Sequence, residues 1–463
     1  MLPRSDMKMR FCALALVTAA GFFLLSSFSA YAQSMNIKKV VSPGGLIAWL
    51  VEDHTLPLIS MQFGFKGGSA QDSVGKEGTA YFVSGMLDEG AGDIRSDAFQ
   101  EKLQDLAIQI SFDAHRDVLT GGIKTLTKNR DEAFRLLRLA LTEPRMDADA
   151  FERVRQQIAA ILKRDNESPD NVAADTWFAH VFTGHPYGTR TKGTLEVLAK
   201  LTPQDLKDFV KTKFARDNLY VAVVGDMTAE ELGAALDDIF GGLPEKAELR
   251  TIPEAVWNTE PRQIIVPKAT PQTIVNFGFP GPKRKDEDFI PSYILNYIVG
   301  GGGFASKLME EVREKRGLAY SVYTYLSPLD HTGIAFGGVA TKNEAVAESI
   351  AVIKDVLTRI SKDGPTAEEL ENAKQYLTGS YALRFSSSAQ IAQILLWVQI
   401  EELGIDYIDK RNSLVEAVTL EDIRRVAGFM DPDSMIMTIV GQPEGLAPPA
   451  GDKPAEAAAP PRG

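Results

Sequence analysis

The sequence predicts an α+β protein made of two similar domains. Three observations lead to this fold class. Strand-like and helical patterns both recur along the chain, the second half repeats motifs of the first, and a polar segment without periodicity separates the halves. The chain has 463 residues, which is enough for two or more domains of ordinary size.

The first 32 residues have the pattern of a secretory signal peptide. Basic residues precede an apolar run from Phe11 to Leu25, and Ala30-Tyr31-Ala32 provides small residues for cleavage, so the mature chain would begin at Gln33. A retained membrane anchor is the alternative, but the apolar run is too short for a span. We therefore expect a periplasmic or secreted protein.

Composition excludes several kinds of site and partner. The only cysteine, Cys12, lies in the leader, so the mature chain would have no disulfide, no thiolate nucleophile and no cysteine metal ligand. The leader carries three basic residues and one acidic residue, so its removal changes the formal charge from −12 to −14. An acidic chain disfavours nucleic acid and anionic membrane as main partners.

The first half of the mature chain alternates between two periodicities. Strand-like runs are Ile37–Val41, Leu46–Val51, Pro57–Phe65, Ile108–Ala114, Val118–Leu126 and Leu219–Val224. Helical runs are Glu77–Asp88, Ser96–Leu106, Arg130–Leu141, Ala148–Arg164, Asn171–Phe182, Pro203–Phe214 and Ala229–Phe240. The first two strands predict a hairpin, which a third strand follows.

The second half repeats the first at offsets of 214 to 219 residues. The four matching pairs are Gln62–Phe65 with Asn276–Phe279, Phe151–Arg153 with Leu370–Asn372, Leu201–Leu206 with Val418–Ile423, and Val223–Gly225 with Ile439–Gly441. Because both the order and the spacing hold, we interpret the pattern as an internal duplication.

The duplication and the breaks in periodicity set the expected domain bounds. Residues 33–243 would form the first domain, 244–262 a linker, and 263–442 the second domain. Residues 443–463 are rich in alanine, proline, glycine and charge, which predicts a disordered tail.

The stretch from Gly300 to Leu326 carries the strongest local signal. Four glycines predict a loop, Ser306 can cap a helix, Gly317 can end it, and a β-prone run follows. Arg313 would lie in the last helical turns and Tyr320 near the start of the strand, so a tight turn at Gly317 would aim both side chains at one space. We interpret this geometry as a binding or catalytic edge.

Simpler interpretations of the same residues remain open. Arg313 can complement the dipole at a helix C-terminus, Tyr320 can be ordinary strand packing, and the glycines can be a flexible turn. No Gly-x-Ser-x-Gly elbow and no phosphate loop occur. His180 and His185 are five residues apart, which does not suit one helical face, so a hydrogen-bonded turn histidine is favoured over a metal ligand at His185.

Several motifs together resemble the pitrilysin/insulinase-like metallopeptidases, and within them the mitochondrial processing peptidase type, which includes bacterial two-subunit enzymes. They are the duplication, the strand end Gly64–Ser69, the turn His185–Gly188, and the run Leu308–Tyr320. The resemblance covers nearly the whole mature chain. It implies two domains, each with a mostly antiparallel sheet packed against helices.

One departure from the family pattern concerns the metal. Active members carry His-x-x-Glu-His on the helix after the Gly-Gly-Ser strand end, whereas Tyr81, Ser84 and Gly85 stand at the corresponding positions here. The distal glutamate ligand aligns near Ile161. By this resemblance no zinc ligand survives in this chain, so it can neither hold zinc nor activate water.

The resemblance also implies a role for the second half. Arg313 and Tyr320 match, in type and in their seven-residue separation, a family pair that faces the zinc helix and binds the substrate backbone and the developing oxyanion. Gly301, Gly302, Gly303 and Phe304 would line the substrate site. The implied protein is a non-catalytic subunit whose zinc-bearing His-x-x-Glu-His partner cleaves peptides or unfolded protein. A structural or a peptide-binding, chaperone-like protein of the same fold is the alternative.

Overall fold

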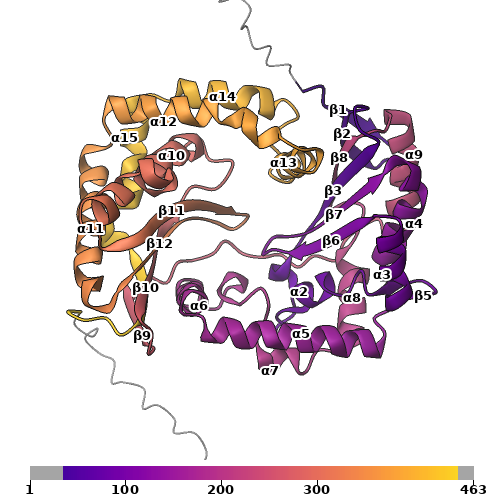
Figure 1. The fold of residues 1–463 in the computed structure, drawn as a ribbon, viewed down its shortest axis with the longest axis horizontal. Helices are drawn as coiled ribbons and strands as arrows, with labels where there is room; N and C mark the ends of the chain where they lie inside the picture. Colours follow the sequence, from indigo (N-terminus) through magenta and orange to yellow (C-terminus); the bar gives the residue numbers. More distant parts are fainter. Residues whose placement is uncertain (1–34, 447–463) are drawn as a thin grey trace, which may run out of the picture. The chain divides into compact units, whose positions relative to one another are not determined.

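The computed structural model describes residues 35–446, and the described residues from Ile37 onward belong to one compact unit (Figure 1). The predicted signal peptide and Cys12 lie outside the described residues, so neither prediction is tested. Within residues 35–446, no helix has the length and apolar character needed to cross a membrane.

The first half contains a six-stranded sheet in the order β1-β2-β8-β3-β7-β6. Its strands are β1 (Lys38–Val41), β2 (Ile47–Glu52), β3 (Leu58–Lys66), β6 (Gln109–Ala114), β7 (Val118–Leu126) and β8 (Leu219–Gly225). The expected hairpin β1–β2 forms, but β3 does not extend it, because β8 inserts between β2 and β3. Two short strands, β4 (Gly90–Ala91) and β5 (Ile94–Arg95), pair separately.

The second half repeats this topology in a five-stranded sheet. Its strands are β9 (Gln263–Pro267), β10 (Gln272–Gly281), β11 (Ala319–Leu329), β12 (Thr332–Lys342) and β13 (Ile436–Gly441). The order β9-β13-β10-β12-β11 matches β2-β8-β3-β7-β6 strand for strand, and only β2–β8 and β9–β13 are parallel pairs. The predicted duplication and the mostly antiparallel sheets are therefore confirmed.

Helices cover both sheets. In the first half they are α2 (Thr79–Ser84), α3 (Ser96–Asp105), α4 (Arg130–Thr142), α5 (Ala148–Glu167), α6 (Pro169–Val181), α7 (Leu195–Leu198), α8 (Pro203–Lys213) and α9 (Ala229–Phe240). In the second half they are α10 (Phe289–Asn296), α11 (Val346–Asp363), α12 (Ala367–Gly379), α13 (Ser388–Ile400), α14 (Tyr407–Ala417) and α15 (Leu420–Val426). The helix expected over Glu77–Asp88 is shorter, since α2 ends at Ser84.

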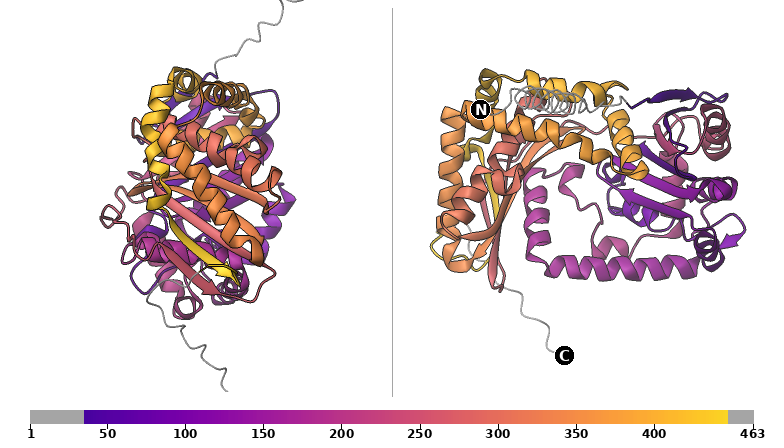
Figure 2. Two further views of the ribbon diagram at one scale, coloured as in Figure 1. Left: turned by 90° about the vertical axis from the view of Figure 1, so that its left-hand side faces the viewer. Right: turned by 45° about the horizontal axis from the view of Figure 1, so that its top comes forward.

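The two halves exchange one helix each (Figures 1 and 2). Helix α6 of the first half packs on β10 and β13, and its counterpart α13 of the second half packs on β3 and β8. Trp177 of α6 is fully buried and donates a hydrogen bond from its indole nitrogen to the Ile436 carbonyl oxygen at 2.9 Å. This exchange ties the two sheets together through apolar contacts.

The repeated Phe-Gly-Phe motif explains how the exchanged helices approach so closely. Phe63 and Phe65 point into the core beneath the first sheet, and Gly64 faces α13, where an added Cβ would lie 3.1 Å from the Ile400 Cδ1 atom. At the equivalent Gly278, an added Cβ would lie 2.4 Å from the Trp177 ring. The glycines are therefore required by helix contact, whereas the flanking phenylalanines build the cores.

The segment expected to be a linker forms no helix or strand, but it is anchored. Trp257 donates a hydrogen bond to the Thr332 hydroxyl at 3.0 Å and packs against Trp177. Of the predicted tail, residues 443–446 are described: the Glu444 N–H donates to the Asn343 carbonyl oxygen at 3.0 Å, and Leu446 contacts the second core. The remainder, 447–463, lies outside the described residues.

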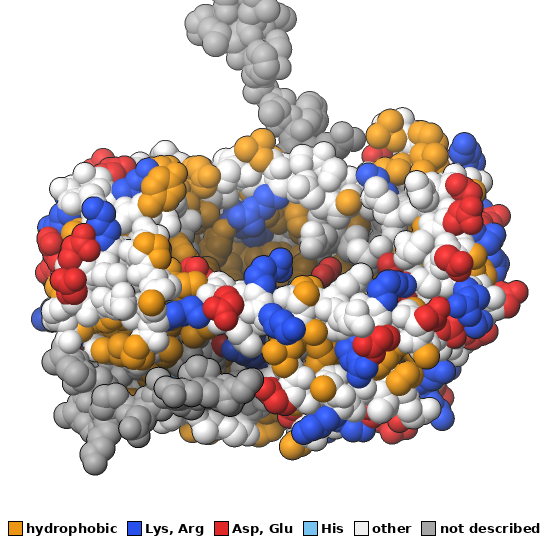
Figure 3. Space-filling view, turned by 60° about the horizontal axis from the view of Figure 1, so that its bottom comes forward, with side chains coloured by type: hydrophobic (Ala, Val, Ile, Leu, Met, Phe, Trp, Pro, Cys, Tyr) orange, Lys and Arg blue, Asp and Glu red, His pale blue; other side chains and the backbone are white. Residues whose placement is uncertain are grey.

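One face of the molecule is hollowed near its centre (Figure 3). Hydrophobic side chains lie within the hollow, and basic side chains stand along its rim. Such a concave, largely apolar surface with a few polar groups is the usual setting for a binding site.

Candidate functional site

The stretch that the sequence singled out folds into a series of tight helical turns. The π-helical turn η4 (Tyr297–Gly301) continues α10, and the 3₁₀ turn η5 (Gly303–Ala305) leads into the π-helix η6 (Met309–Glu314). Ser306 accepts a long hydrogen bond from the Met309 N–H at 3.5 Å, as its predicted capping role requires. The predicted helix forms, but its central turns are π-helical, a form often found at functional sites.

The glycines do not form the expected flexible loop. Gly300 and Gly301 lie within the π-helical turn η4, where an added Cβ on Gly300 would lie 2.5 Å from the Thr324 hydroxyl oxygen. At Gly302, an added Cβ would lie 2.8 Å from the Tyr297 carbonyl oxygen. The prediction of a loop was wrong here because these glycines permit close packing against β11 and α10, and Gly303 alone among the four has a positive φ, of 57°.

Gly317 ends the helix and reverses the chain. Its φ is 62°, its N–H donates to the Arg313 carbonyl oxygen at 2.8 Å, and the Leu318 N–H donates to the Val312 carbonyl oxygen at 2.9 Å. β11 begins two residues later with a β-bulge, in which Tyr320 and Ser321 together oppose one residue of β12. The bulge leaves the Tyr320 side chain 79% exposed.

The turn brings Arg313 and Tyr320 together, as the spacing predicts. The Arg313 guanidinium carbon lies 4.5 Å from the centre of the Tyr320 ring and 4.6 Å from the centre of the Phe304 ring. Cation–π contacts with these two rings hold the guanidinium in place. Within residues 35–446 the Arg313 side chain has no ion pair and no hydrogen bond to protein.

The two cations in the turn that follows this helix are neutralised instead. Lys315 and Arg316 pair with the Glu311 carboxylate at 2.8 and 2.6 Å. These contacts, the Lys315 hydrogen bond first, hold the pKa of Glu311 at about 2. Among the described residues, Arg313 is therefore the one cation between Lys307 and Arg316 that has no carboxylate partner, and it lies beside the exposed Tyr320 ring.

Two further tyrosines continue this aromatic surface along the edge strand β11. Tyr323 and Tyr325 are each 44% exposed and stack with ring centres 6.2 Å apart. Tyr325 also contacts Phe336 of β12. The described edge of the second sheet thus presents an aromatic face together with unpaired backbone groups.

The first-half positions that the family pattern assigns to zinc do not fit a metal. Gly85 has no side chain, and a Cβ there would lie 3.3 Å from a Val154 methyl group. The Ser84 hydroxyl donates to the Tyr81 carbonyl oxygen at 2.8 Å, and Ile161 on α5 is apolar. No arrangement of these four residues supplies the nitrogen, sulfur or carboxylate ligands that zinc requires.

A lysine lies over this helix. The Lys192 ammonium sits 5.9 Å from the centre of the Tyr81 ring and pairs with the Asp165 carboxylate at 2.7 Å. Asp165 is buried and also accepts from the Asn171 amide at 3.1 Å. Among the described residues, no group of three or more histidine, cysteine, aspartate or glutamate side chains could hold a metal ion.

A buried carboxylate organises the start of α2. Asp72 accepts hydrogen bonds from the Gly78 and Ala80 N–H groups at 2.8 and 2.9 Å. Burial raises the pKa of Asp72 to about 7 despite these two bonds. Asp72 therefore caps the helix and makes its anchoring depend on pH.

His185 is a turn histidine, as the sequence favours. Its Nδ1 accepts from the Tyr187 N–H at 3.1 Å, and its Nε2–H donates to the Pro253 carbonyl oxygen at 3.0 Å. Both ring nitrogens are thus used by the backbone, which leaves neither for a metal.

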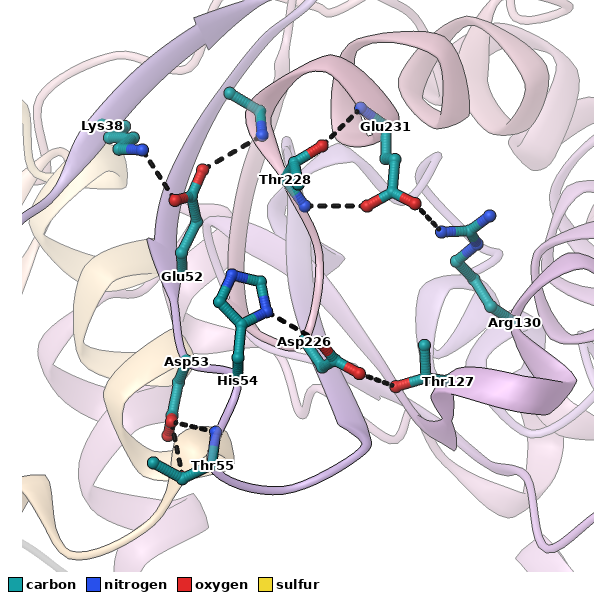
Figure 4. Close-up of polar contacts among 11 residues, drawn as sticks. Lys38, Glu52, Asp53, His54, Thr55, Thr127, Arg130, Asp226, Thr228 and Glu231 are labelled. Atoms are coloured by element: carbon teal, nitrogen blue, oxygen red, sulfur yellow. Dashed lines mark hydrogen bonds and ion pairs between the residues drawn. The ribbon is translucent and has the colours of Figure 1, made fainter.

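A histidine–aspartate pair lies at the end of β2 and β8 (Figure 4). His54 Nδ1 is 2.7 Å from the Asp226 carboxylate, which also accepts from the Thr127 hydroxyl at 2.8 Å. The hydrogen bond to Asp226 raises the pKa of His54. No hydroxyl or thiol nucleophile contacts His54 within the described chain, so this surface network is structural.

Comparison with known proteins agrees with this geometry. Residues 50–195 match the model of the insulinase family, peptidase family M16, and residues 200–377 match the model of the peptidase M16 inactive domain. This chain belongs to the M16 peptidase family. The resemblance inferred from the motifs is therefore confirmed.

One of the similar M16 proteins is named a non-peptidase homologue, and others are named zinc proteases. The non-peptidase homologue YmxG of Helicobacter pylori is 29% identical over 337 residues, which are 72% of this chain and 77% of the relative. An uncharacterized zinc protease, YmxG of Bacillus subtilis, is 23% identical over 355 residues, 76% of this chain and 85% of the relative. The match to the inactive domain and to the non-peptidase homologue is consistent with a non-catalytic M16 member without zinc.

Two solved structures share the fold. The peptidase M16 inactive domain from Pseudomonas fluorescens has a TM-score of 0.82 at 26% identity, covering 88% of this chain and 98% of that one. A protease from Helicobacter pylori has a TM-score of 0.77 at 20% identity, covering 87% of this chain and 99% of that one.

The structure thus joins Arg313, Tyr320 and Phe304, and it leaves Gly301, Gly302 and Gly303 as backbone spacers beside them. Sequence reasoning missed the π-helix and the bulge that build this cluster.

Proposed function

We propose that this chain is the zinc-free subunit of a heterodimeric M16 metallopeptidase that degrades or processes peptides. The observation that carries this proposal is the Arg313 guanidinium, which two aromatic rings hold while no carboxylate among the described residues pairs with it. Its N–H groups and the exposed Tyr320 hydroxyl suit a peptide carbonyl and the negative charge that develops on its oxygen during cleavage.

The partner would be a homologous subunit with His-x-x-Glu-His, whose zinc activates water. This chain would bind and orient the substrate: Arg313 and Tyr320 donate to the carbonyl oxygen, and Phe304 holds Arg313. Gly301, Gly302 and Gly303 would keep the backbone close to the substrate.

The substrate would be an extended peptide or an unfolded segment. The edge strand β11 offers backbone groups for strand addition, and the exposed rings of Tyr323 and Tyr325 offer contacts for alternate side chains. The predicted leader would place this activity in the periplasm or outside the cell.

A mixing experiment tests the proposal. An unfolded peptide is incubated with this chain alone, with the zinc-bearing partner alone, and with both. We expect rapid cleavage by the mixture and none by this chain alone. Cleavage by this chain alone would overturn the proposal. An inactive mixture that still binds peptide would instead favour the chaperone-like alternative.

A further inference from the structure

A second cavity lies where α10, α13, α14 and the 3₁₀ turn η8 (Tyr381–Phe385) meet. Its volume is about 480 Å³, and neither Arg313 nor Tyr320 lines it. Its wall combines five aromatic rings with three guanidinium groups: Phe289, Tyr293, Tyr381, Trp397, Tyr407, Arg284, Arg384 and Arg411. This composition differs from that of an apolar core.

The three arginines are held by neutral partners. Arg284 donates to the Tyr407 hydroxyl at 2.6 Å, and its guanidinium carbon lies 4.2 Å from the Phe289 ring centre. Arg384 donates to the Tyr293 hydroxyl at 3.4 Å. Within residues 35–446, none of the three arginines has a carboxylate oxygen within 4.0 Å.

Arg411 is the clearest case of a buried guanidinium that has no counter-ion among the described residues. It is only 5% exposed, and it donates to the Leu377 carbonyl oxygen at 2.7 Å and to the Asn412 amide oxygen at 2.9 Å. Its guanidinium carbon lies 4.5 Å from the Tyr381 ring centre. A buried cation normally has an anionic partner, because an unpaired charge is costly in a poorly solvated place.

Donor capacity remains for a ligand. Each guanidinium has five N–H groups, and Arg284 and Arg384 each use one within the described chain. Glu401 is the one carboxylate in the described wall, and burial raises its pKa, which favours its neutral form. The cavity is therefore cationic, aromatic and preorganised.

We propose that this cavity binds a carboxylate attached to an apolar or aromatic group. The carboxylate would accept paired hydrogen bonds from the arginines, and the apolar group would pack between the tyrosine and tryptophan rings. If the chain handles peptides, as proposed above, the natural source is the C-terminal residue of a peptide. A free aromatic acid is the other source of the same chemistry.

Binding is measured on the full mature chain without a zinc-bearing partner. The probes are N-acetylphenylalanine, N-acetylphenylalanine amide, and one decapeptide ending in phenylalanine as its free acid and as its amide. Calorimetry reports binding. We expect each acid to bind about tenfold or more tightly than its amide, since the charged hydrogen bonds are lost with the carboxylate.

Two variants test the cavity itself. Arg284→Gln and Arg384→Gln should each weaken binding of the acid about tenfold, whereas Arg359→Gln, an exposed arginine paired with Asp355 on α11, should leave it unchanged. The urea midpoint of each variant confirms folding.

Equal binding of acid and amide, or no binding at all, would overturn the proposal, as would insensitivity to both cavity variants. Binding of the small acid but not of the peptide acid would support the carboxylate site and exclude the peptide as its source. Because no partner is present, these results are independent of the mixing experiment, and either proposal can fail alone.

Discussion

The two halves of the chain have the same strand order but differ at one edge. In the first half, Gln109 of β6 pairs with Lys124 of β7 in an unbroken ladder. At the matching place in the second half, Tyr320 and Ser321 of β11 together oppose Ala340 of β12. One inserted residue therefore turns Tyr320 outward.

The helix that precedes the edge strand is also regular in the first half and irregular in the second. α3 is an ordinary α-helix that ends at Asp105, and the chain turns two residues later at Ala107, which has a φ of 51°. By contrast, η6 is π-helical and ends at Glu314, and the chain turns at Gly317, which has a φ of 62°. A π-helix and a bulge each accommodate an extra residue. The lesson is that the Arg313–Tyr320 site arises from two local irregularities in a duplicated scaffold.

The helix α2, on which the family pattern places the zinc ligands, shows the opposite difference: here a site is lost. α2 forms with Asp72 as its cap, but the positions that the family pattern assigns to the metal carry Tyr81, Ser84 and Gly85. Packing against Val154 replaces ligand space there. The first half has thus kept the scaffold without the site.

Among the variants that test the comparison of the two halves, we expect the largest loss of stability at the equivalent glycines Gly64 and Gly278. We expect Gly278→Ala to destabilise the protein by about 3 kcal/mol, because the new methyl group meets the rigid, buried Trp177 ring. Gly64→Ala should cost about 1 kcal/mol, since the new methyl group meets only the methyl ends of Ile400 and Val118, at 3.1 and 3.2 Å. Urea unfolding measures both. Equal losses would show that the two exchanged helices are held alike.

A pH-dependent effect concerns the buried cap of α2. The pKa of Asp72 is raised from 3.8 to about 7, so the folded state binds this proton more tightly than the unfolded state. The contribution of Asp72 to stability should therefore fall as the pH rises from about 4 to 7. We expect Asp72→Asn to remove this slope in urea unfolding.

Asp422, the capping aspartate of α15, gives a matched control of opposite sign. Its hydrogen bond from Thr419 lowers its pKa, so its contribution is present above pH 3.8 and is lost as the pH falls further. If Asp72→Asn and Asp422→Asn show the same pH dependence, the account of Asp72 is wrong.

Phe304 tests whether the ring contact on Arg313 matters. Phe304→Leu removes one of the two aromatic faces while leaving an apolar side chain at a position that is 64% exposed. We expect kcat/KM of the mixed subunits to fall about fivefold, as the loss of about 1 kcal/mol of cation–π contact implies. Leu414→Ala, at an exposed residue of α14, is the control and should leave kcat/KM unchanged.

The smallest effect belongs to His54. Its pKa is raised by Asp226, so the stabilisation is fully present below its unfolded pKa of 6.5 and is lost as the pH rises through the folded value. We expect His54→Gln to lower Tm slightly near pH 5.5 and to match the wild type near pH 9. A Tm difference that grows with pH would contradict this assignment.

Much of this fold could be predicted from the sequence. The Phe-Gly-Phe repeat and the capping threonines Thr202 and Thr419 mark equivalent elements, because each depends on local chemistry that both halves retain. The site prediction succeeded for Arg313 and Tyr320 as neighbours, since a helix, a glycine turn and a strand fix their geometry within eight residues.

Other features could not be predicted because they depend on tertiary contact. The exchange of α6 and α13 depends on which sheet each helix meets, and the apolar residues of a helix do not specify the sheet against which it packs. The arginine cavity gathers residues from 284 to 411, far apart in the chain. The glycines from 300 to 303 were misassigned to a loop. Glycine is found both in flexible loops and where backbones pack closely, so its presence in the sequence does not distinguish the two.

Steady-state kinetics of Arg313→Ala mixed with the zinc-bearing partner tests the central claim most directly. The account predicts that kcat falls by about a hundredfold or more, the usual loss for one donor to a developing oxyanion, while the two subunits still associate. Arg316→Ala, whose guanidinium pairs with Glu311, serves as the control and should keep kcat within about twofold. An unchanged kcat in Arg313→Ala would contradict the account.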